Sequence, residues 1–267
     1  MKYMMLIKSN ARTEGGASTD KAFDEAMGAY NQALIDARVW VTAEGFQSSA
    51  NGARLALDGA GLKVENGLFE NPEEVVAGFW IIDVASREEA LDWAKKAPFA
   101  VEGSTTTHGS GEIELRRVYE FPADEAASEH SNANGNGASK PASGDLPAKR
   151  YIGMLKASPE TETGQMPDTA IFEAMNASLG KLAQQGLFVD GNGLMPTSEG
   201  AIVRFSGGTP LVTDGPFAET KEAIAGYAII RANSLDEMAE YSREGMEIEA
   251  RWRKGPILAE IRELFSF

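Results

Sequence analysis

The sequence repeats itself at an offset of 148 residues, and this duplication constrains the fold more than any other feature. The offset follows from subtracting the number of Tyr3 from that of Tyr151. Carried along without a gap, it pairs Lys8 with Lys156, Met27 with Met175, Leu34 with Leu182, Gly45 with Gly193, Gly52 with Gly200, Gly67 with Gly215, Phe69 with Phe217, Glu74 with Glu222, and Glu112-Ile113 with Glu260-Ile261. A register kept over almost a whole copy indicates an internal duplication.

The duplication predicts two domains, residues 1–120 and 149–267, joined by a linker over residues 121–148. From Phe121 to Arg150 the chain is rich in Ala, Ser, Asn, Gly and Pro. Such a segment buries too little apolar surface to offset the entropy of ordering it, so we predict a flexible tether. The tether makes the encounter of the two copies intramolecular.

Charge and cysteine content exclude several classes of function. The 267 residues include 40 acidic and 25 basic side chains, a formal net charge of -15, which would repel nucleic acid and anionic membranes. The absence of cysteine excludes disulfides and thiolate metal sites. The apolar run from Tyr3 to Ile7 is too short for a signal peptide or a membrane span. We therefore expect a cytoplasmic protein without nucleic-acid or membrane partners.

Each copy begins with a β-rich apolar run, at 3–8 and 151–156, followed by a polar loop and a helix. Apolar residues at helical spacing predict a core-facing stripe on that helix. The stripe residues are Phe23, Ala26, Met27, Tyr30 and Leu34 in the first copy, and Ile171, Ala174, Met175, Ser178 and Leu182 in the second.

Three short strands, a second helix and a final strand complete each copy. The strands are expected at 39–42, 54–57 and 78–84, with counterparts at 187–189, 202–205 and 226–231, and the final strands at 112–119 and 259–264. Ser86 with Glu89, and Ser234 with Glu237, have the capping-box spacing that opens a helix. The order β-α-β-β-β-α-β predicts an α+β fold of two tandem ferredoxin-like domains, each an antiparallel sheet with helices on one face.

A sheet covered by helices on one face alone would expose apolar side chains on the other. We expect the second copy to cover that face, which gives an intramolecular pseudo-dimeric α+β barrel. The molecule would then be a monomer built as a pseudo-dimer, or a further homodimer of such chains.

The string Asp214-Gly215-Pro216-Phe217, with the following AETKE and the apolar strand 224–230, resembles the signature of the DGPF-type branch of the YCII-related family. The segments YIGMLKAS, LAQQGLFVDGNGLMP and ILAEIREL of the second copy fit the same pattern. In the first copy the string is Asn66-Gly67-Leu68-Phe69, so that copy has a degenerate motif. The resemblance implies a ferredoxin-like fold that pairs into a dimeric α+β barrel, with a small-molecule site around the motif aspartate.

Asp214 has two interpretations. As a turn former, it would accept hydrogen bonds from nearby backbone N–H groups. As a site residue, it would act as a general base or orient a ligand, with Lys221 setting its charge state. The full candidate set is Asp214 as the catalytic residue and Tyr151, Asp214, Phe217, Lys221 and Glu222 as ligand-binding residues.

Other chemistry has little support in the sequence. Some YCII relatives that resemble enzymes use a His–Asp pair, but His108 aligns with Pro256, outside the helix where the family histidine is expected, and His130 falls in the linker. Neither a metal-ligand spacing nor a dinucleotide fingerprint is present, so we expect no metal and no cofactor.

Three hypotheses for the function remain. The first is a binding or regulatory module that holds a small organic ligand near the motif. The second is a lyase or isomerase acting on a small (aromatic) substrate, with Asp214 as base and Tyr151 or Lys221 stabilising negative charge. The third is a protein-interaction module.

Overall fold

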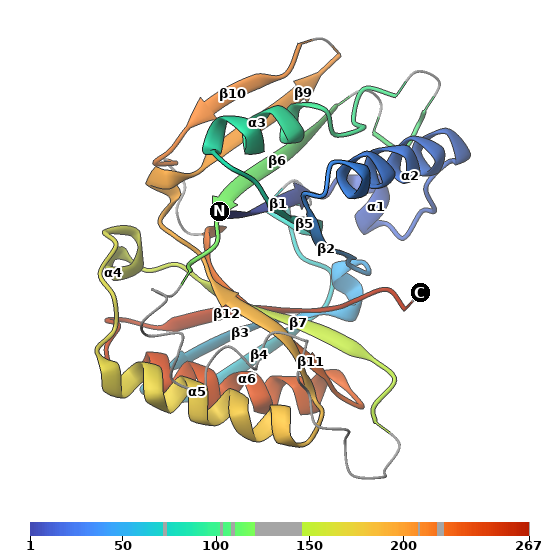
Figure 1. Cartoon of the computed structure of the whole chain (residues 1–267). Helices are drawn as coiled ribbons and strands as arrows, with labels where there is room; N and C mark the ends of the chain where they lie inside the picture. The colour runs from blue at the N-terminus through green and yellow to red at the C-terminus, as the bar shows by residue number, and fades with distance from the viewer. Residues whose placement is uncertain are drawn as a thin grey trace. The chain divides into compact units, whose positions relative to one another are not determined.

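The computed structural model describes residues 1–71, 74–101, 104–107, 110–120, 146–207, 209–217 and 222–266. Most of the linker expected at 121–148 lies outside these residues. The chain divides into two compact units (Figure 1). Unit 1 comprises 1–49, 68–118 and 195–218, and unit 2 comprises 50–67, 119–194 and 219–267. Each unit therefore contains residues of both sequence copies.

Unit 1 is built on a six-stranded antiparallel sheet in the order β10-β9-β6-β1-β5-β2. Its strands are β1 (Lys2–Lys8), β2 (Trp40–Gly45), β5 (Val76–Asp83), β6 (Ser110–Arg117), β9 (Ala201–Ser206) and β10 (Leu211–Asp214). Numbered within the first copy, β6-β1-β5-β2 is the order 4-1-3-2 of a ferredoxin-like domain. The expected α+β fold class is confirmed.

Unit 2 has the same plan, in the order β4-β3-β12-β7-β11-β8. Its strands are β3 (Ala53–Asp58), β4 (Gly61–Asn66), β7 (Arg150–Lys156), β8 (Phe188–Gly193), β11 (Ile224–Arg231) and β12 (Ile257–Glu263). The ferredoxin-like part, β12-β7-β11-β8, comes from the second copy. The hairpin β3-β4 comes from the first copy and pairs with β12 through Leu57 opposite Ile257 and Ala53 opposite Ile261.

The two hairpins are thus exchanged between the copies. In unit 1 the hairpin β9-β10 of the second copy extends the sheet at β6, with Ala201 opposite Leu115. The sequence predicts β3 and β9 but neither β4 nor β10, so the strand order of each copy was short by one strand. β4 was missed because its GLKVEN sequence is polar and the strand is mostly exposed at a sheet edge.

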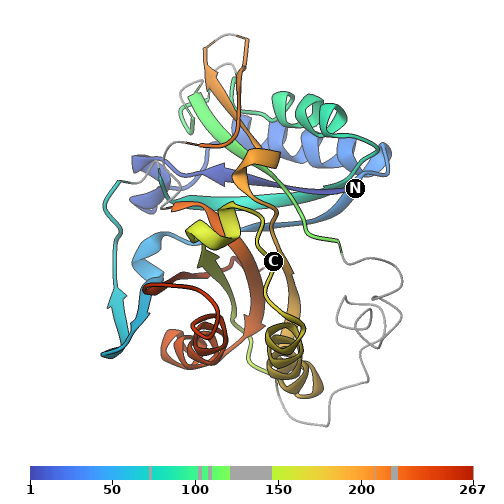
Figure 2. The ribbon, with the colours of Figure 1, turned by 90° about the vertical axis from the view of Figure 1, so that its left-hand side faces the viewer.

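Helices cover one face of each sheet, as predicted. Unit 1 carries α1 (Ala11–Glu14), α2 (Lys21–Asp36) and α3 (Arg87–Lys95), and unit 2 carries α4 (Pro159–Glu162), α5 (Thr169–Gln184) and α6 (Leu235–Glu249). In unit 2, α5 and α6 lie side by side along the sheet (Figure 1, Figure 2). The short helices α1 and α4 replace part of the polar loop expected after the first strand of each copy.

The helix starts follow the expected caps in modified form. The Ser86 hydroxyl accepts from the backbone N–H of Glu89, and the Ser234 hydroxyl accepts from that of Glu237. The two glutamates do not reach back to the cap residue. The Glu89 carboxylate accepts from the backbone N–H of Ala85, one residue before the cap.

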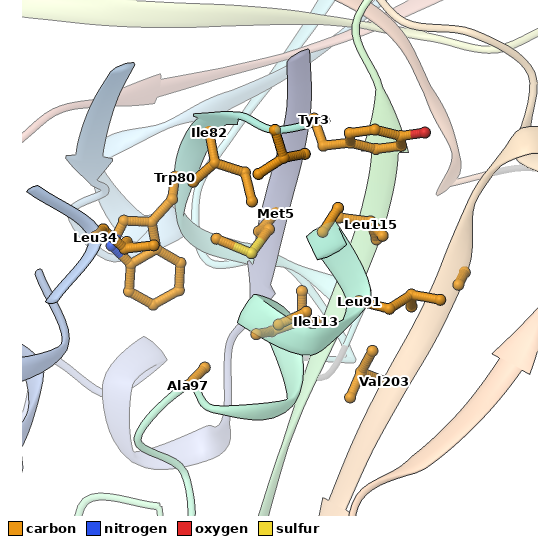
Figure 3. Packing of buried hydrophobic residues seen from close by; sticks show 14 of the residues in the cluster. Tyr3, Met5, Leu34, Trp80, Ile82, Leu91, Ala97, Ile113, Leu115 and Val203 are labelled. Carbon is orange, nitrogen blue, oxygen red and sulfur yellow. The ribbon is translucent and has the colours of Figure 1, made fainter. Parts of the chain in front are cut away.

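The core of unit 1 lies between the sheet and its helices, where Met5, Trp80, Ile82, Leu115 and Val203 pack together (Figure 3). The predicted helical stripe faces this core, since Tyr30 and Leu34 are buried. Trp40 and Trp93 pack against the same cluster. Val203 belongs to the exchanged hairpin, so the second copy contributes to this core.

Strand register corrects the sequence alignment of the two copies near their ends. Leu6 pairs with Glu114 in unit 1, and Met154, the counterpart of Leu6, pairs with Glu260 in unit 2. Glu260 is therefore the structural counterpart of Glu114, and the ungapped match to Glu112 was wrong by two residues. Counted from the start of the second helix to the last strand, the second copy is two residues shorter, although α6 is longer than α3.

Among the described residues, no helix is long and apolar enough to cross a membrane.

Candidate functional site

The structure divides the predicted site residues between the two units. Asp214 and Phe217 belong to unit 1, whereas Tyr151 and Glu222 belong to unit 2. Lys221 lies outside the described residues. The tyrosine that shares a cavity with Asp214 is Tyr3, the first-copy counterpart of Tyr151.

The motif glycine has a structural role in both copies. The backbone N–H of Gly215 donates to the Gly200 carbonyl at 3.2 Å, and that of Gly67 donates to the Gly52 carbonyl at 3.3 Å. At Gly215 an added Cβ would lie 1.8 Å from the Thr197 carbonyl oxygen. A side chain has no room there, so close backbone packing explains the glycine of the motif.

Asp214 ends β10 and pairs with an arginine of the first copy. Arg87, the first residue of α3, donates from Nη2 to Asp214 Oδ1 at 2.5 Å and to the Gly200 carbonyl at 3.0 Å. The Asp214 side chain is 71% exposed, and that of Arg87 is 30% exposed. The partner of the motif carboxylate is thus a guanidinium rather than the backbone of its own turn.

An open cavity of about 580 Å³ surrounds this ion pair within unit 1. Its lining residues are Met1, Tyr3, Ser86, Arg87, Glu88, Arg117, Ser198, Glu199 and Asp214. The volume is within the range of small-molecule sites. Strand β1, the ends of β6 and β10, the start of α3 and the turn before β9 therefore meet at one polar hollow.

Tyr3 is the buried group of this cavity. The residue is 3% exposed, its ring packs in the unit 1 core, and its hydroxyl points away from the other labelled side chains (Figure 3). Burial raises the pKa of Tyr3, while Arg117 and Arg87 act in the opposite direction. The hydroxyl makes no hydrogen bond to the part of the chain that the structure describes, and its oxygen is open to the cavity rather than shut off from solvent.

A second ion pair borders the cavity. Arg117, at the end of β6, donates from Nη1 to Glu199 Oε2 at 2.9 Å. Glu199 belongs to the short 3-10 helix Thr197–Glu199 before β9. As with Arg87 and Asp214, the arginine comes from the first copy and the carboxylate from the second.

The corresponding place in unit 2 lacks both ion pairs. By the repeat offset, Leu235 stands for Arg87 and Asn66 for Asp214. By the strand register, Glu263 stands for Arg117, and Asn51 takes the place of Glu199. Both members of each pair are replaced together.

The tyrosine is retained in unit 2, but its hydroxyl is satisfied there. Tyr151 is 2% exposed and donates to Glu263 Oε2 at 3.4 Å. Lys149 binds the same carboxylate oxygen at 3.0 Å. Hydrogen bonding to Glu263 contributes most to raising the pKa of Lys149. In unit 2 the tyrosine hydroxyl is therefore bound to a neighbouring carboxylate, whereas the hydroxyl of Tyr3 in unit 1 has no such partner among the described residues.

The YCII-related domain model matches residues 1–121 and 150–250. The chain belongs to the YCII-related family. Both matches together cover most of the chain and correspond to the two sequence copies, as the DGPF-type motif predicted.

Among curated proteins, this YCII-related chain is 36% identical over 77 residues to an uncharacterized protein of Rhizobium meliloti (strain 1021). The match covers 29% of this chain and 62% of that relative. Among solved structures, two chlorite dismutase mutants from Candidatus Nitrospira defluvii give TM-scores of 0.44 and 0.40 at 8% and 9% identity, covering 99% of this chain and 91% and 90% of theirs. At TM-scores below 0.5 this similarity bears on neither fold nor function.

The YCII-related chain also contains a buried charge cluster in each unit that the sequence reading missed. In unit 1, Glu114 binds Lys8 at 3.2 Å and Arg116 at 2.9 Å. In unit 2, Glu260 binds Lys156 and Arg262, both at 3.3 Å. The ungapped alignment hid this repetition because it matched Glu260 to Glu112.

Ion pairing keeps these clusters charged. Burial favours the neutral form of Glu114, but Lys8 and Arg116 outweigh it and lower the pKa. The pKa of Glu260 is lowered in the same way, against burial, by Lys156 and Arg262.

Glu222, a predicted ligand-binding residue, belongs to the unit 2 cluster. Its carboxylate accepts from Lys156 Nζ at 2.8 Å and lies 3.8 Å from Arg54 Nη2. Burial opposes the charge of Lys156, yet Glu260 and Glu222 raise its pKa. These contacts give Glu222 a structural role in the ion pairing of unit 2.

His108 and His130 both lie outside the described residues. Within the described ranges, no group of three or more His, Cys, Asp or Glu side chains is arranged to hold a metal ion.

Proposed function

We propose that this YCII-related protein binds one small organic ligand per chain, in the unit 1 cavity beside Asp214. The observation that carries the proposal is the Tyr3 hydroxyl, which lines the cavity and has no hydrogen-bond partner among the described residues. The hydroxyl is open to solvent in the cavity, so a ligand group that enters would supply that partner in place of water.

The difference between the units supports a single site. In unit 2 the hydroxyl of Tyr151 is bound to Glu263, and the residues corresponding to both cavity ion pairs are absent. The degenerate first-copy motif, with Asn66 in place of the aspartate, contributes to that second place. The intact motif contributes to the cavity with the open hydroxyl.

The lyase or isomerase alternative is less well supported. A carboxylate becomes a stronger base when it is buried away from cations. Asp214 is instead 71% exposed and bound to Arg87. We therefore favour binding over proton abstraction by Asp214.

A thermal-shift screen of small organic compounds tests the proposal, because a ligand that binds the folded state raises the melting temperature. Ser198 is exposed and lines the cavity, so Ser198→Trp should fill it without disturbing the core. The matched control is Ala50→Trp, at the exposed corresponding position of unit 2.

We expect compounds that raise the melting temperature of the wild type and of Ala50→Trp, but not of Ser198→Trp. A library without any such compound, or shifts of equal size in both variants, would contradict the proposal. Equal shifts would mean that the ligand binds elsewhere.

A further inference from the structure

We infer that the unit 1 cavity selects a small monocarboxylate, bound by Arg117, Arg87 and the Tyr3 hydroxyl, with Asp214 as the positioning residue of Arg87. This inference rests on the proposed function and names the chemical class of its ligand. It also assigns the motif aspartate a role through Arg87 rather than in direct contact with the ligand.

The two guanidinium groups are held in place and still have donors to offer. The hydrogen bonds that Arg87 makes to described residues all leave from Nη2, and the one that Arg117 makes leaves from Nη1. Each guanidinium carries five N–H donors in a planar fork that matches a carboxylate. Anchoring by Asp214 and Glu199 fixes the direction of the remaining donors, which lowers the entropy lost on binding.

Tyr3 adds a neutral donor to these two cations. A phenol of ordinary pKa, about 10, already keeps its proton at neutral pH, and burial raises the pKa of Tyr3 further, so the hydroxyl can donate to an anion. Arg117 and Arg87 favour a negative charge near this donor, whereas Glu199 and Glu88 oppose it more weakly.

The charge of the cavity limits the ligand to a single negative charge. Glu88, Glu199 and Asp214 line it together with two guanidinium groups and Met1, whose N-terminal ammonium is already paired with Asp83. A phosphate dianion would meet stronger repulsion from the three carboxylates than a monocarboxylate would. Hydrogen-bond donors elsewhere on the ligand could bind these carboxylates.

The internal duplication supports the positioning role of Asp214. In unit 2, Asn66 corresponds to Asp214 and Leu235 corresponds to Arg87. A leucine forms no ion pair with a carboxylate. If the aspartate contacted the ligand directly, loss of the arginine alone would not remove its role. The joint replacement fits a carboxylate that works through Arg87.

The test is isothermal titration of the full chain with benzoate, benzamide and phenyl phosphate, followed by a panel of small aliphatic and aromatic monocarboxylates, each beside its primary amide. The variants are Arg117→Gln, Arg87→Leu, Asp214→Asn and the double variant Arg87→Leu/Asp214→Asn. Tyr151→Phe in unit 2 is the control, and circular dichroism checks the fold of each variant.

We expect carboxylates to bind about tenfold or more tightly than their amides and more tightly than phenyl phosphate, and Arg117→Gln to weaken binding about tenfold or more. Asp214→Asn should weaken binding in the wild-type background and have no effect in the Arg87→Leu background. An effect of Asp214→Asn that persists without Arg87 would overturn the positioning role.

The outcomes separate this inference from the proposed function. If amides or phenyl phosphate bind at least as well as carboxylates, and Ser198→Trp abolishes that binding, the cavity is a ligand site but the monocarboxylate assignment is wrong. If Ser198→Trp abolishes the binding of no carboxylate, amide or phosphate in the panel, both the assignment and the proposed function fail.

Discussion

The unit 1 cavity and its counterpart in unit 2 occupy the same place in two copies of one fold, yet only the first has the chemistry of a site. Tyr3 and Tyr151 are both buried near the start of the first strand of their copies. Tyr3 faces a cavity with two anchored arginines, whereas Tyr151 is bound to Glu263. The buried Lys-Glu-Arg clusters, in contrast, occur in both units. The comparison separates features that belong to the fold from features that belong to the site.

The largest expected effect is on the free energy of unfolding, and it concerns the buried Lys-Glu-Arg clusters that both units contain. Glu114→Gln and Glu260→Gln should each lower the free energy of unfolding by about 3–5 kcal/mol, because they leave buried cations without their carboxylate. The loss should be greater for Glu114→Gln. Lys156 keeps Glu222 at 2.8 Å, whereas Lys8 has no other carboxylate among the described residues. Urea unfolding followed by circular dichroism measures both, and the reverse order would contradict this account of the clusters.

Replacement of the two motif glycines by alanine should destabilise the protein by different amounts, although their backbone hydrogen bonds are nearly the same. Gly215→Ala should cost about 3 kcal/mol or more, because its Cβ would overlap the Thr197 carbonyl. Gly67→Ala should cost about 1–2 kcal/mol, since it has open space around it but a φ of 137°. Equal melting temperatures of the two variants would show that the turn around Gly215 relaxes to admit a side chain.

Acid should weaken both clusters. The folded pKa values of Glu114 and Glu260 lie below the ordinary value of 4.5, so these groups stabilise the fold above that value. The contribution is lost as the pH falls through the folded pKa values. A pH series of urea unfolding should therefore show stability decreasing below about pH 4.5, with a shallower decrease in Glu114→Gln and Glu260→Gln. The same acid profile in wild type and variants would remove these glutamates as its cause.

The smallest expected effect separates the two tyrosines. Tyr151→Phe should lower stability by about 0.5–1 kcal/mol, because it removes the hydrogen bond to Glu263. Tyr3→Phe should leave stability nearly unchanged, since its hydroxyl has no partner in the described part of the chain. Thermal unfolding without ligand measures both. A larger loss for Tyr3→Phe would contradict the open hydroxyl on which the site depends.

Local patterns predicted much of the fold. The helical stripe ending in Leu34 and the serine caps at Ser86 and Ser234 are short-range signals, and the structure buries the stripe and starts both helices at these serines. The exchange of the hairpins was not predicted. Which sheet edge a hairpin joins depends on tertiary packing, and nothing in the residues of β9 distinguishes β6 from β12 as a partner.

The site was harder to predict for the same reason. The sequence offered Asp214 as a turn former or as a site residue, and its group of neighbours was assembled from its own copy. The hairpin exchange brings it to Arg87 and Tyr3 of the other copy instead. One signal was available in the sequence. Asp214 and Arg87 are both replaced at their repeat counterparts, by Asn66 and Leu235, and this joint replacement indicates that the two residues interact.

The hairpin exchange also has a genetic consequence. In a symmetric dimer of identical single-copy chains, every substitution alters both sites at once. In this fused chain, Arg87 and Asp214 come from different copies but occur in one cavity, and Leu235 and Asn66 occur in the other unit. Each codon therefore affects one unit, so selection can preserve the unit 1 cavity while the corresponding place in unit 2 accumulates changes. In a fused chain the two places no longer have to inherit the same substitutions.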